Sequence, residues 1–587
     1  KLGGEIDPSC LSGNRKTIWN KIDGSAETLH LLFFDEIASN IQSGKLSLLH
    51  SYNYKRLSRL LISKEEWTAN KIRILKATNL YRFIDFLQYR MTATNRLDTM
   101  YEEINMYCQS PDCTDLSFDD GGKVKLTEPR KEKEKYEQAI STLLYDARGT
   151  SVTRIMTDIN SVTPYDGLFP HAMHTGVIKD VEENQLVGAI LSQGLNLGSR
   201  KMFESSVGLD ESSLSNIIRF RLTKDNLKRA NDRINAAIDE LPLSAEFQKY
   251  FDALMSSSDG QKQSVMKDSL ISAHSHKYFH QDSGITRYPM VDEKGRVRNV
   301  TVFSPIRRES KYLIDVLASN ITDIPLHHAT DTHGYTEPVF ACTHLMGVRF
   351  MPRIKDLEDQ VYYGARPAKW YKDKGYSIRP KSKINWNIIE SNWDEILRFM
   401  ASILSGKCLA SQLFNRLNSY AADHPLYKAL KELGRVEKSF FLLCYYRYKE
   451  IRNNIQRQLN LGEHMNKFTK ALTWGKSNRL IGETTEEFER AAGCTQLIQN
   501  CIIYWNYLYA SERLAKMRDP IERERLVIGL AAGQMVAWGH VNYTVTFQFR
   551  RRPKSSVRFN LDVLTNMPLL GREKGPSPWY PFDDDFL

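Results

Sequence analysis

Residues 251–331 carry the pattern that most restricts what this chain can fold into. Residues 251–255 are a short apolar segment that runs into SSSDGQ, which predicts a strand ending in a turn. The segments RYPMV and RVRNVTVF flank the short connection DEKG and predict two antiparallel strands. Residues 310–319 have a helical pattern, and PLHHATD predicts a further strand. The expected order is strand, strand, strand, helix, strand, with Asp259 after the first strand and Asp331 ending the fourth.

This order resembles that of an RNase H-like fold, which places its first two metal-binding carboxylates on neighbouring strands of one mixed sheet. The third carboxylate of that fold usually lies on a later helix. A helix predicted over residues 440–459 stops at Gly462, because glycine commonly ends a helix. Glu463 is then expected to open the next helix and to supply the third acid.

Asp259, Asp331 and Glu463 together suit phosphoryl transfer on DNA. That reaction needs an activated oxygen nucleophile, a stabilised leaving oxygen and neutralised phosphate charge, which two Mg²⁺ ions supply. Such hard cations bind carboxylate oxygens rather than thiolates. Each acid alone has an ordinary explanation, as a turn residue, a cap or a first-turn helix acid. The three taken together indicate a catalytic metal site.

The strings around these acids resemble those of the large replicative transposases of the Tn3 family. They are SSSDGQ, TDTHGYT and QRQLNLGE. In that family the Asp of the first string, the second residue of the second string and the Glu of the third form the catalytic triad, which corresponds to Asp259, Asp331 and Glu463. Similar strings follow in the family's order from about residue 150 to 545: GLNLGSRKM, VFACTHLMGVRFMPRIKDL, ALKELGRV, TQLIQNCIIYWNYLY and WGHVN.

The resemblance implies a DDE transposase that uses Mg²⁺ or Mn²⁺, with two ions per active site. It implies nicking at the transposon's 3′ ends, then transfer of those ends into target DNA, by a homodimer that bridges two ends. Two positions depart from the family pattern: Leu461 replaces a usual Lys and His333 replaces a common Gly. The alternative third acids are Glu483, Glu487 and Glu489.

Two other functions stay open at this point. A structure-directed nuclease would hydrolyse DNA without joining it, and a catalytically inactive fragment or regulator would only bind DNA. The net charge of +11 agrees with a polyanionic partner in each case. The expected DNA contacts flank the acids, with solvated charges or internal ion pairs as the alternative. They are Arg287, Arg307, Arg308, His333, Arg353 and Lys355.

Histidine and cysteine spacing offers a competing zinc site, which we do not favour. The histidine groups are His274, His276 and His280, and His327, His328, His333 and His344. Lone histidines are more often structural, and the pair Cys108 and Cys113 has no second pair to complete four ligands. In the region after the second acid, the aromatic residues are expected to pack in the core rather than to stack on bases. These residues are Trp370, Tyr371 and Trp386.

The chain is too long for one hydrophobic core, so several domains are expected. We expect an α/β RNase H-like core with a large helical insertion, flanked by mainly α-helical domains. The expected parts are 1–150 (helical dimerisation or linker region), 151–245 (helical), 246–345 (first core part), 346–440 (helical insertion), 441–510 (second core part) and 511–587 (C-terminal region). Two apolar helix faces are expected, one formed by Leu80, Phe83, Ile84, Leu87 and Met91, and one by Trp393, Ile396, Leu397, Met400 and Leu404.

The chain has no run of about eighteen apolar residues and no signal-peptide pattern at its start. Its eight cysteines are scattered, which fits reduced thiols. These features predict a cytoplasmic protein, and the resemblance implies a bacterial, nucleoid-associated one. The first residue is Lys rather than Met, and we expect the chain to begin after the terminal-repeat recognition domains that the longer family members carry.

Overall fold

The computed structural model describes most of the chain, in thirteen stretches. These are 6–21, 25–42, 46–51, 54–118, 124–127, 143–173, 181–250, 255–319, 325–419, 424–531, 535–544, 546–549 and 558–567. The chain divides into two compact units, each assembled from segments distant in the sequence. The first comprises Lys1–Met106, Thr336–Met346 and Val361–Leu443; the second comprises Tyr107–Tyr335, Gly347–Gln360 and Cys444–Leu587. The linear parts predicted from the sequence are a different division and stay predictions.

The first unit is mainly helical. Its longer elements are α2 (Ala26–Gln42), α4 (Lys64–Ala77), α5 (Phe86–Gln109), α15 (Glu337–Met346), α18 (Trp393–Leu404), α19 (Ala410–Ser419) and α20 (Pro425–Arg447); its shorter ones are α1 (Gly13–Trp19), α3 (Leu57–Leu60), α16 (Ala368–Asp373), α17 (Trp386–Ser391), β12 (Tyr363–Gly364) and β13 (Ser382–Lys383). The apolar face predicted on α18 is confirmed, because all five of its members are buried.

The other predicted face, which ends at Met91, is wrong over its second half. Its first two members are buried, whereas Ile84, Leu87 and Met91 are exposed. A short 3-10 turn, η2 (Tyr81–Phe83), precedes α5, which begins only at Phe86. The two segments therefore do not share one helical phase, and α5 buries a different set of side chains.

The second unit contains a seven-stranded mixed sheet with helices packed against it. The strands are β5 (Met255–Ser258), β6 (Gln261–Ser264), β7 (Ala273–His274), β8 (Ser283–Asp292), β9 (Val297–Phe303), β10 (His327–Thr330) and β11 (Arg349–Phe350). Their order is β11-β10-β5-β8-β6, and β7 and β9 also pair with β8. The hairpin predicted around DEKG is confirmed, because β8 and β9 are antiparallel. Strands β6 and β7 were not predicted.

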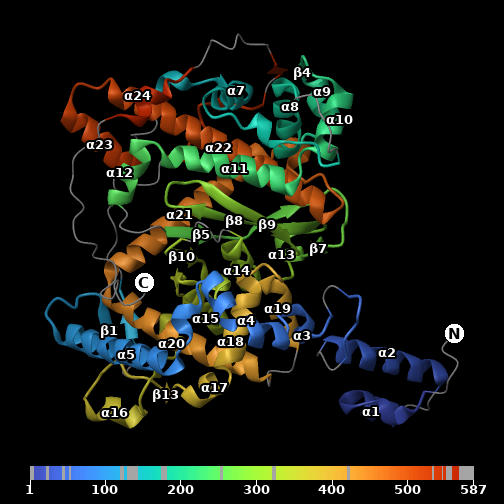
Figure 1. Ribbon diagram of the computed structural model, residues 1–587, viewed down its shortest axis with the longest axis vertical. Coiled ribbons are helices and arrows are strands. Elements are labelled where there is room, and N and C mark those ends of the chain that lie inside the picture. Colours follow the sequence, from blue (N-terminus) through green and yellow to red (C-terminus); the bar gives the residue numbers. More distant parts are fainter. Residues whose placement is uncertain are drawn as a thin grey trace. The chain divides into compact units, whose positions relative to one another are not determined.

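Helices of this unit enclose its hydrophobic core together with β8 and β9. They are α7 (Val152–Val162), α8 (Glu183–Gly194), α9 (Ser199–Glu204), α10 (Glu211–Phe220), α11 (Lys224–Asp239), α12 (Pro242–Tyr250), α21 (Lys449–Leu472), α22 (Thr485–Ala515), α23 (Pro520–Ala531) and α24 (Leu561–Thr565). Another helix of this unit, α14 (Ser310–Ala318), contacts β9. Helix α22 begins with a capping box between Thr484 and Glu487. It lies alongside α11 and contacts β9 (Figure 1). Most of its length is buried on all sides, as expected for a central core helix.

Within the described ranges, no helix is long and apolar enough to cross a membrane.

Candidate active site

The first two predicted acids follow neighbouring parallel strands. Strands β5 and β10 pair so that Ser258 lies opposite Thr330. The next residue of each strand is a predicted acid, Asp259 or Asp331. Because the strands run in the same direction in this register, both carboxylates lie at the same edge of the sheet. The predicted strand order therefore brings two distant acids together.

Glu463 lies inside a helix rather than at the start of one. Helix α21 runs unbroken from Lys449 to Leu472, so the prediction that Gly462 ends a helix is wrong. A Cβ at Gly462 would lie 3.3 Å from the Oγ of Ser257 on β5. The glycine therefore lets α21 approach the strand closely. The predicted helix over residues 440–459 is also two helices, which are separated at the extended residue Tyr448.

Hydrogen bonds attach α21 to the strand that carries Asp259. Asn466 Nδ2 donates to Asp259 Oδ2 over 2.9 Å, and Gln261 Nε2 donates to the Asn466 carbonyl oxygen over 3.0 Å. Ser257 Oγ donates to the Gln458 carbonyl oxygen over 3.2 Å. Glu463 is exposed and lies three residues before Asn466, and residues three apart share one side of a helix. The third acid therefore belongs to the same edge as the first two.

Carboxylates crowd around Asp259. Burial, together with the charges of Glu309, Asp331 and Glu463, raises the pKa of Asp259 to about 6, against a hydrogen bond from the Gly260 backbone N–H. Glu309 is so close that a Cβ on Gly260 would overlap its carboxylate. This end of the sheet, the acidic edge, therefore holds four acidic side chains: Asp259, Glu309, Asp331 and Glu463. The sequence analysis did not predict Glu309.

Only two cations pair with these acids among the described residues. Arg353 Nη2 lies 3.1 Å from Asp331 Oδ1, and both side chains are about two-fifths exposed. Lys262 Nζ lies 2.7 Å from Glu309 Oε1 and donates to Thr286 Oγ1 over 3.0 Å. No lysine or arginine of the described stretches forms an ion pair with Asp259 or Glu463. The edge keeps a surplus of negative charge.

The acids share this edge without forming a closed ligand set. Over the part of the chain that the structure describes, no three His, Cys, Asp or Glu side chains are grouped closely enough to hold a metal ion. The assignment of Asp259, Asp331 and Glu463 as metal ligands thus stays a prediction.

The predicted DNA contacts divide into exposed and buried side chains. Arg307, Arg308 and Lys355 are exposed. Arg287 is 3% exposed and donates to the Ala492 carbonyl oxygen over 3.1 Å, and burial lowers its pKa to about 10. This placement takes Arg287 off the surface that DNA could reach. The side chain of His333 lies outside the described residues.

The alternative third acids have other contacts. Glu483 pairs with Lys267, Glu487 caps the start of α22, and Glu489 lies 2.9 Å from Lys224. None of these contacts involves Asp259 or Asp331. Glu463 is therefore the acid that best suits the third position.

The histidines next to the second acid are structural in character. His327 and His328 are buried on β10, and burial lowers the pKa of each to about 3. His328 Nδ1 shares a 2.7 Å hydrogen bond with Ser256 Oγ. Neutral buried imidazoles in such contacts stabilise the strand pair rather than carry charge. In the first unit, Tyr371 and Trp386 are buried, which agrees with core packing.

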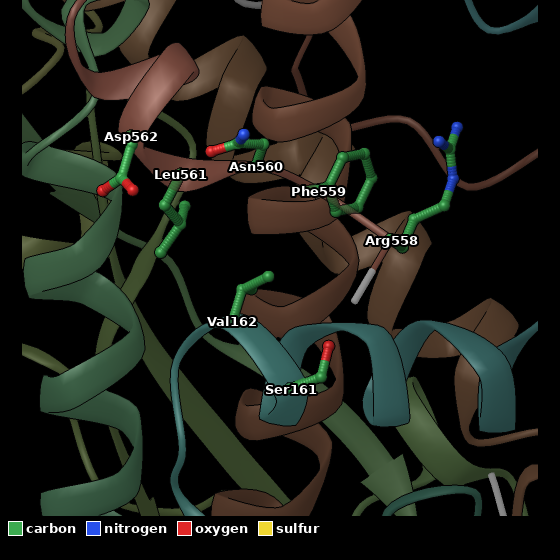
Figure 2. A pocket seen from close by; sticks show the side chains of 7 residues that line it. All are labelled: Ser161, Val162, Arg558, Phe559, Asn560, Leu561 and Asp562. Atoms are coloured by element: carbon green, nitrogen blue, oxygen red, sulfur yellow. The ribbon is translucent and has the colours of Figure 1, made fainter. Parts of the chain in front are cut away.

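A hollow of about 490 Å³ lies elsewhere on the second unit (Figure 2). It is lined by Ser161, Val162, Arg558, Phe559, Asn560, Leu561 and Asp562. None of the predicted site residues lines it, so it is separate from the acidic edge.

Asn466, Glu309 and Lys262 were missed by the sequence analysis. Asn466 follows Glu463 at a spacing of three, which marks one helix face only when the helix is known to continue past Gly462. Glu309 immediately precedes the predicted helix 310–319, where an acid also has an ordinary role as a first-turn residue. Neither signal stands out until the elements are placed in space.

The chain resembles known transposases over most of its length. Residues 154–547 match the family described as Tn3 transposase DDE domain. The transposase for transposon Tn1546 of Enterococcus faecium is 27% identical over 534 residues, which are 90% of this chain and 52% of that protein. The transposase for transposon Tn2501 of Escherichia coli is 28% identical over 565 residues, which are 94% and 55% of the two chains. The transposase for transposon Tn501 of Pseudomonas aeruginosa is 29% identical over 411 residues, or 68% and 40%. The chain spans about half the length of the first two curated relatives.

Proposed function

The chain belongs to the Tn3 transposase DDE domain family, and on that premise we propose that it is the catalytic part of a DNA transposase. It would nick transposon DNA at its 3′ ends and join those ends to target DNA during replicative transposition. The observation that carries this proposal is the parallel register of β5 and β10, which puts Asp259 and Asp331 at one sheet edge. The attachment of α21 to that edge brings Glu463 into the same neighbourhood.

The mixed sheet of the second unit would be an RNase H-like core. The order β5, β8, β9, α14, β10 supports this assignment, because it matches the predicted strand and helix order. The helices between β11 and α21 would be an insertion between two core parts, at residues 246–345 and 441–510. The regions 1–150 and 511–587 would flank that core.

The donor set at the acidic edge fits divalent metal ions, which a DDE domain implies. Its oxygen donors are the carboxylates that Mg²⁺ and Mn²⁺ prefer. Burial and the neighbouring carboxylate charges both raise the pKa of Asp259. Asp259, Asp331 and Glu463 would hold two such ions. When bound, the ions would neutralise phosphate charge and activate the attacking oxygen.

The chain's own residues would orient the ligands and the DNA. Asn466 holds the Asp259 carboxylate through its Oδ2 atom. Arg353 pairs with Asp331 through a half-exposed contact, which costs little to break, so its guanidinium could turn to a phosphate. Arg307, Arg308 and Lys355 would contact phosphates without reading the sequence. A homodimer would bridge the two transposon ends.

Single-turnover assays on labelled DNA carrying the element's own ends test this function. We expect Asp259→Ala, Asp331→Ala and Glu463→Ala each to bind DNA while losing nicking and joining by about a thousandfold or more in Mg²⁺ or Mn²⁺. Glu483→Ala is the matched control, since Glu483 is an exposed acid paired with Lys267, and it should keep both activities.

Three results would change the assignment. Activity in Glu463→Ala would remove the third acid. Nicking without joining of a pre-nicked end would indicate a nuclease. A wild-type chain that binds DNA and never cuts would be a binding fragment.

A further inference from the structure

The loop between β9 and α14 presents one apolar side chain between two cations. Ile306 is 71% exposed, and Arg307 and Arg308 next to it are also exposed. A single exposed isoleucine is ordinary on a protein surface. Ile306 differs from a scattered exposed isoleucine because it lies at the tip of a short loop and is followed directly by two exposed arginines.

The base of the loop is closed by packing and hydrogen bonds. The rings of Phe303 and Tyr312 stack with centroids 3.8 Å apart and an angle of 2° between their planes. The Arg307 N–H donates to the Ser304 carbonyl oxygen over 2.9 Å and thus closes a turn. The Tyr312 N–H donates to the Glu309 carbonyl oxygen over 2.9 Å. The tip is therefore held on a fixed support.

The loop and the helix that follows it contact the acidic edge at two points, one beside Asp259 and one beside Asp331. Glu309 touches Gly260, the residue after Asp259, and its carboxylate is held by Lys262. Helix α14, which follows the loop, contacts η7 (Thr332–Gly334), which directly follows Asp331. A duplex with its phosphate at this edge would pass close to the loop.

The charge around the tip favours a polyanion over an apolar protein surface. Arg307 and Arg308 form no ion pair with a carboxylate of the described segments. Burial lowers the pKa of Lys311, and the charges of Arg307 and Arg308 lower it further. Arg307 and Arg308 thus lie beside Ile306, and covering these two arginines with an apolar protein face would bury their charges at a high desolvation cost.

We propose that Ile306 is a wedge that enters between stacked base pairs of the DNA at the active site, with Arg307 and Arg308 on the flanking phosphates. Apolar wedges of this kind partly unstack a base step and kink the duplex. This inference rests on the proposed function for its ligand, and it adds that the bound duplex is distorted. The ligand is duplex DNA, and the activity assays below distinguish a transposon end from a target.

Fluorescence of 2-aminopurine tests the wedge without any need for catalysis. The base is placed at successive steps around the cleavage site of an end duplex, and around the target junction of a branched joining product. Without divalent metal, binding of the wild-type chain should raise the fluorescence at one step, and Ile306→Leu should do the same. Ile306→Ser should bind both DNAs and leave that step stacked. Leu270→Ser is the matched control, because Leu270 is a fully exposed leucine elsewhere on the unit, and it should behave as the wild type.

Activity assays then identify which duplex is bent. Ile306→Ser should slow the affected reaction by about tenfold, because the base step would have to unstack without the wedge. A mismatch at that step should restore the rate to within about twofold of the wild type. Loss of joining into paired target, with normal nicking, assigns the wedge to the target. Loss of nicking that a mismatch in the end restores assigns it to the transposon end.

The wedge is overturned if bound DNA shows no unstacked step, or if Ile306→Ser unstacks it as well as the wild type. It is also overturned if Ile306→Ser changes the oligomeric state in light scattering and leaves the fluorescence unaltered, because the tip would then be a protein contact. These outcomes are independent of the proposed function, whose failure appears as a wild-type chain that never cuts.

Discussion

The acidic edge and the turn between β8 and β9 both combine carboxylates with cations, but they balance the charges differently. At the turn, Arg296 lies 2.6 Å from Asp239 and 2.7 Å from Asp292, and Lys294 also pairs with Asp239. These cations hold the pKa of Asp239 below its usual range, although burial opposes them. At the edge, the pKa of Asp259 is raised instead.

The turn also shows how this chain removes a surplus charge when no cation is to bind. Glu293 is 7% exposed, and its Oε1 atom has no hydrogen-bond partner among the residues that the structure describes. Burial raises its pKa to about 7, and the charge of Asp292 contributes, so a proton neutralises Glu293 over part of the neutral range. At the acidic edge, Asp331 and Glu463 are accessible to solvent. The surplus of negative charge there is better suited to binding a cation from solution. Carboxylates of the same unit thus acquire opposite roles from the cations placed beside them.

The largest effect on stability is expected from removing the cation at the turn. Arg296→Met would leave the buried carboxylate of Asp292 without the guanidinium that pairs with it, and the partly exposed Asp239 with Lys294 as its remaining cation. This loss should lower the free energy of unfolding by about 3–5 kcal/mol. Arg353→Met is the control at the acidic edge, where the half-exposed pair should contribute less than about 1 kcal/mol. Urea unfolding of both variants measures the contrast. Equal losses of unfolding free energy in the two variants would mean that cations neutralise the carboxylates of the acidic edge as fully as those of the turn.

A smaller effect is expected from the side chain that orients Asp259. Asn466→Ala removes the hydrogen bond to Asp259 Oδ2 and should weaken binding of divalent ions by about 10–100-fold, as loss of an outer-shell partner commonly does. Calorimetric titration with Mn²⁺ measures this change. The free energy of unfolding should change by only about 1 kcal/mol.

Asn460→Ala is the matched control for that variant. Asn460 is exposed on the same helix, and its side chain accepts a hydrogen bond from Gln456. It should leave Mn²⁺ binding unchanged. If both asparagine variants bind Mn²⁺ as the wild type does, Asn466 has no positioning role.

The sequence predicted the β8–β9 hairpin and the positions of Asp259 and Asp331 at the ends of two strands, because local sequence patterns determine both features. Alternating strands and a Gly-containing connection predicted the β8–β9 hairpin, and strand order placed Asp259 beside Asp331. Helix α21 was predicted less well, because glycine in a sequence indicates a helix end. In the structure, packing against Ser257 makes Gly462 a contact residue instead.

Burial was also beyond what local patterns reveal. Arg287 was expected to face DNA because it flanks an acid in the sequence, yet β8 is the central strand of the sheet and is covered by α22 at Ala492. An arginine on a covered strand is satisfied by a backbone carbonyl rather than by phosphate. Only the three-dimensional arrangement distinguishes such a residue from Arg307 or Arg308 on an open loop.

The smallest expected effect is on the pH dependence of stability, and it is specific to the edge. A carboxyl whose folded pKa is about 6 and whose ordinary value is 3.8 binds more protons in the folded state between these values. Stability from this group is therefore fully present below about pH 3.8 and is lost as the pH rises through 6. In EDTA, the free energy of unfolding of the wild type should fall by about 1–2 kcal/mol relative to Asp259→Asn between pH 4 and pH 7, after allowance for solvent screening.

Divalent metal should reverse this loss in the wild type alone. An ion bound by ionised Asp259 stabilises the folded state by mass action, and proton and metal compete for the same oxygens. Urea unfolding at pH 7 with excess Mn²⁺ should therefore raise the stability of the wild type above that of Asp259→Asn. The opposite result would be parallel pH profiles of unfolding free energy in the two proteins and equal responses to Mn²⁺. The charges of the acidic edge would then be neutralised as they are at the turn, and the surplus around Asp259 would not affect metal binding.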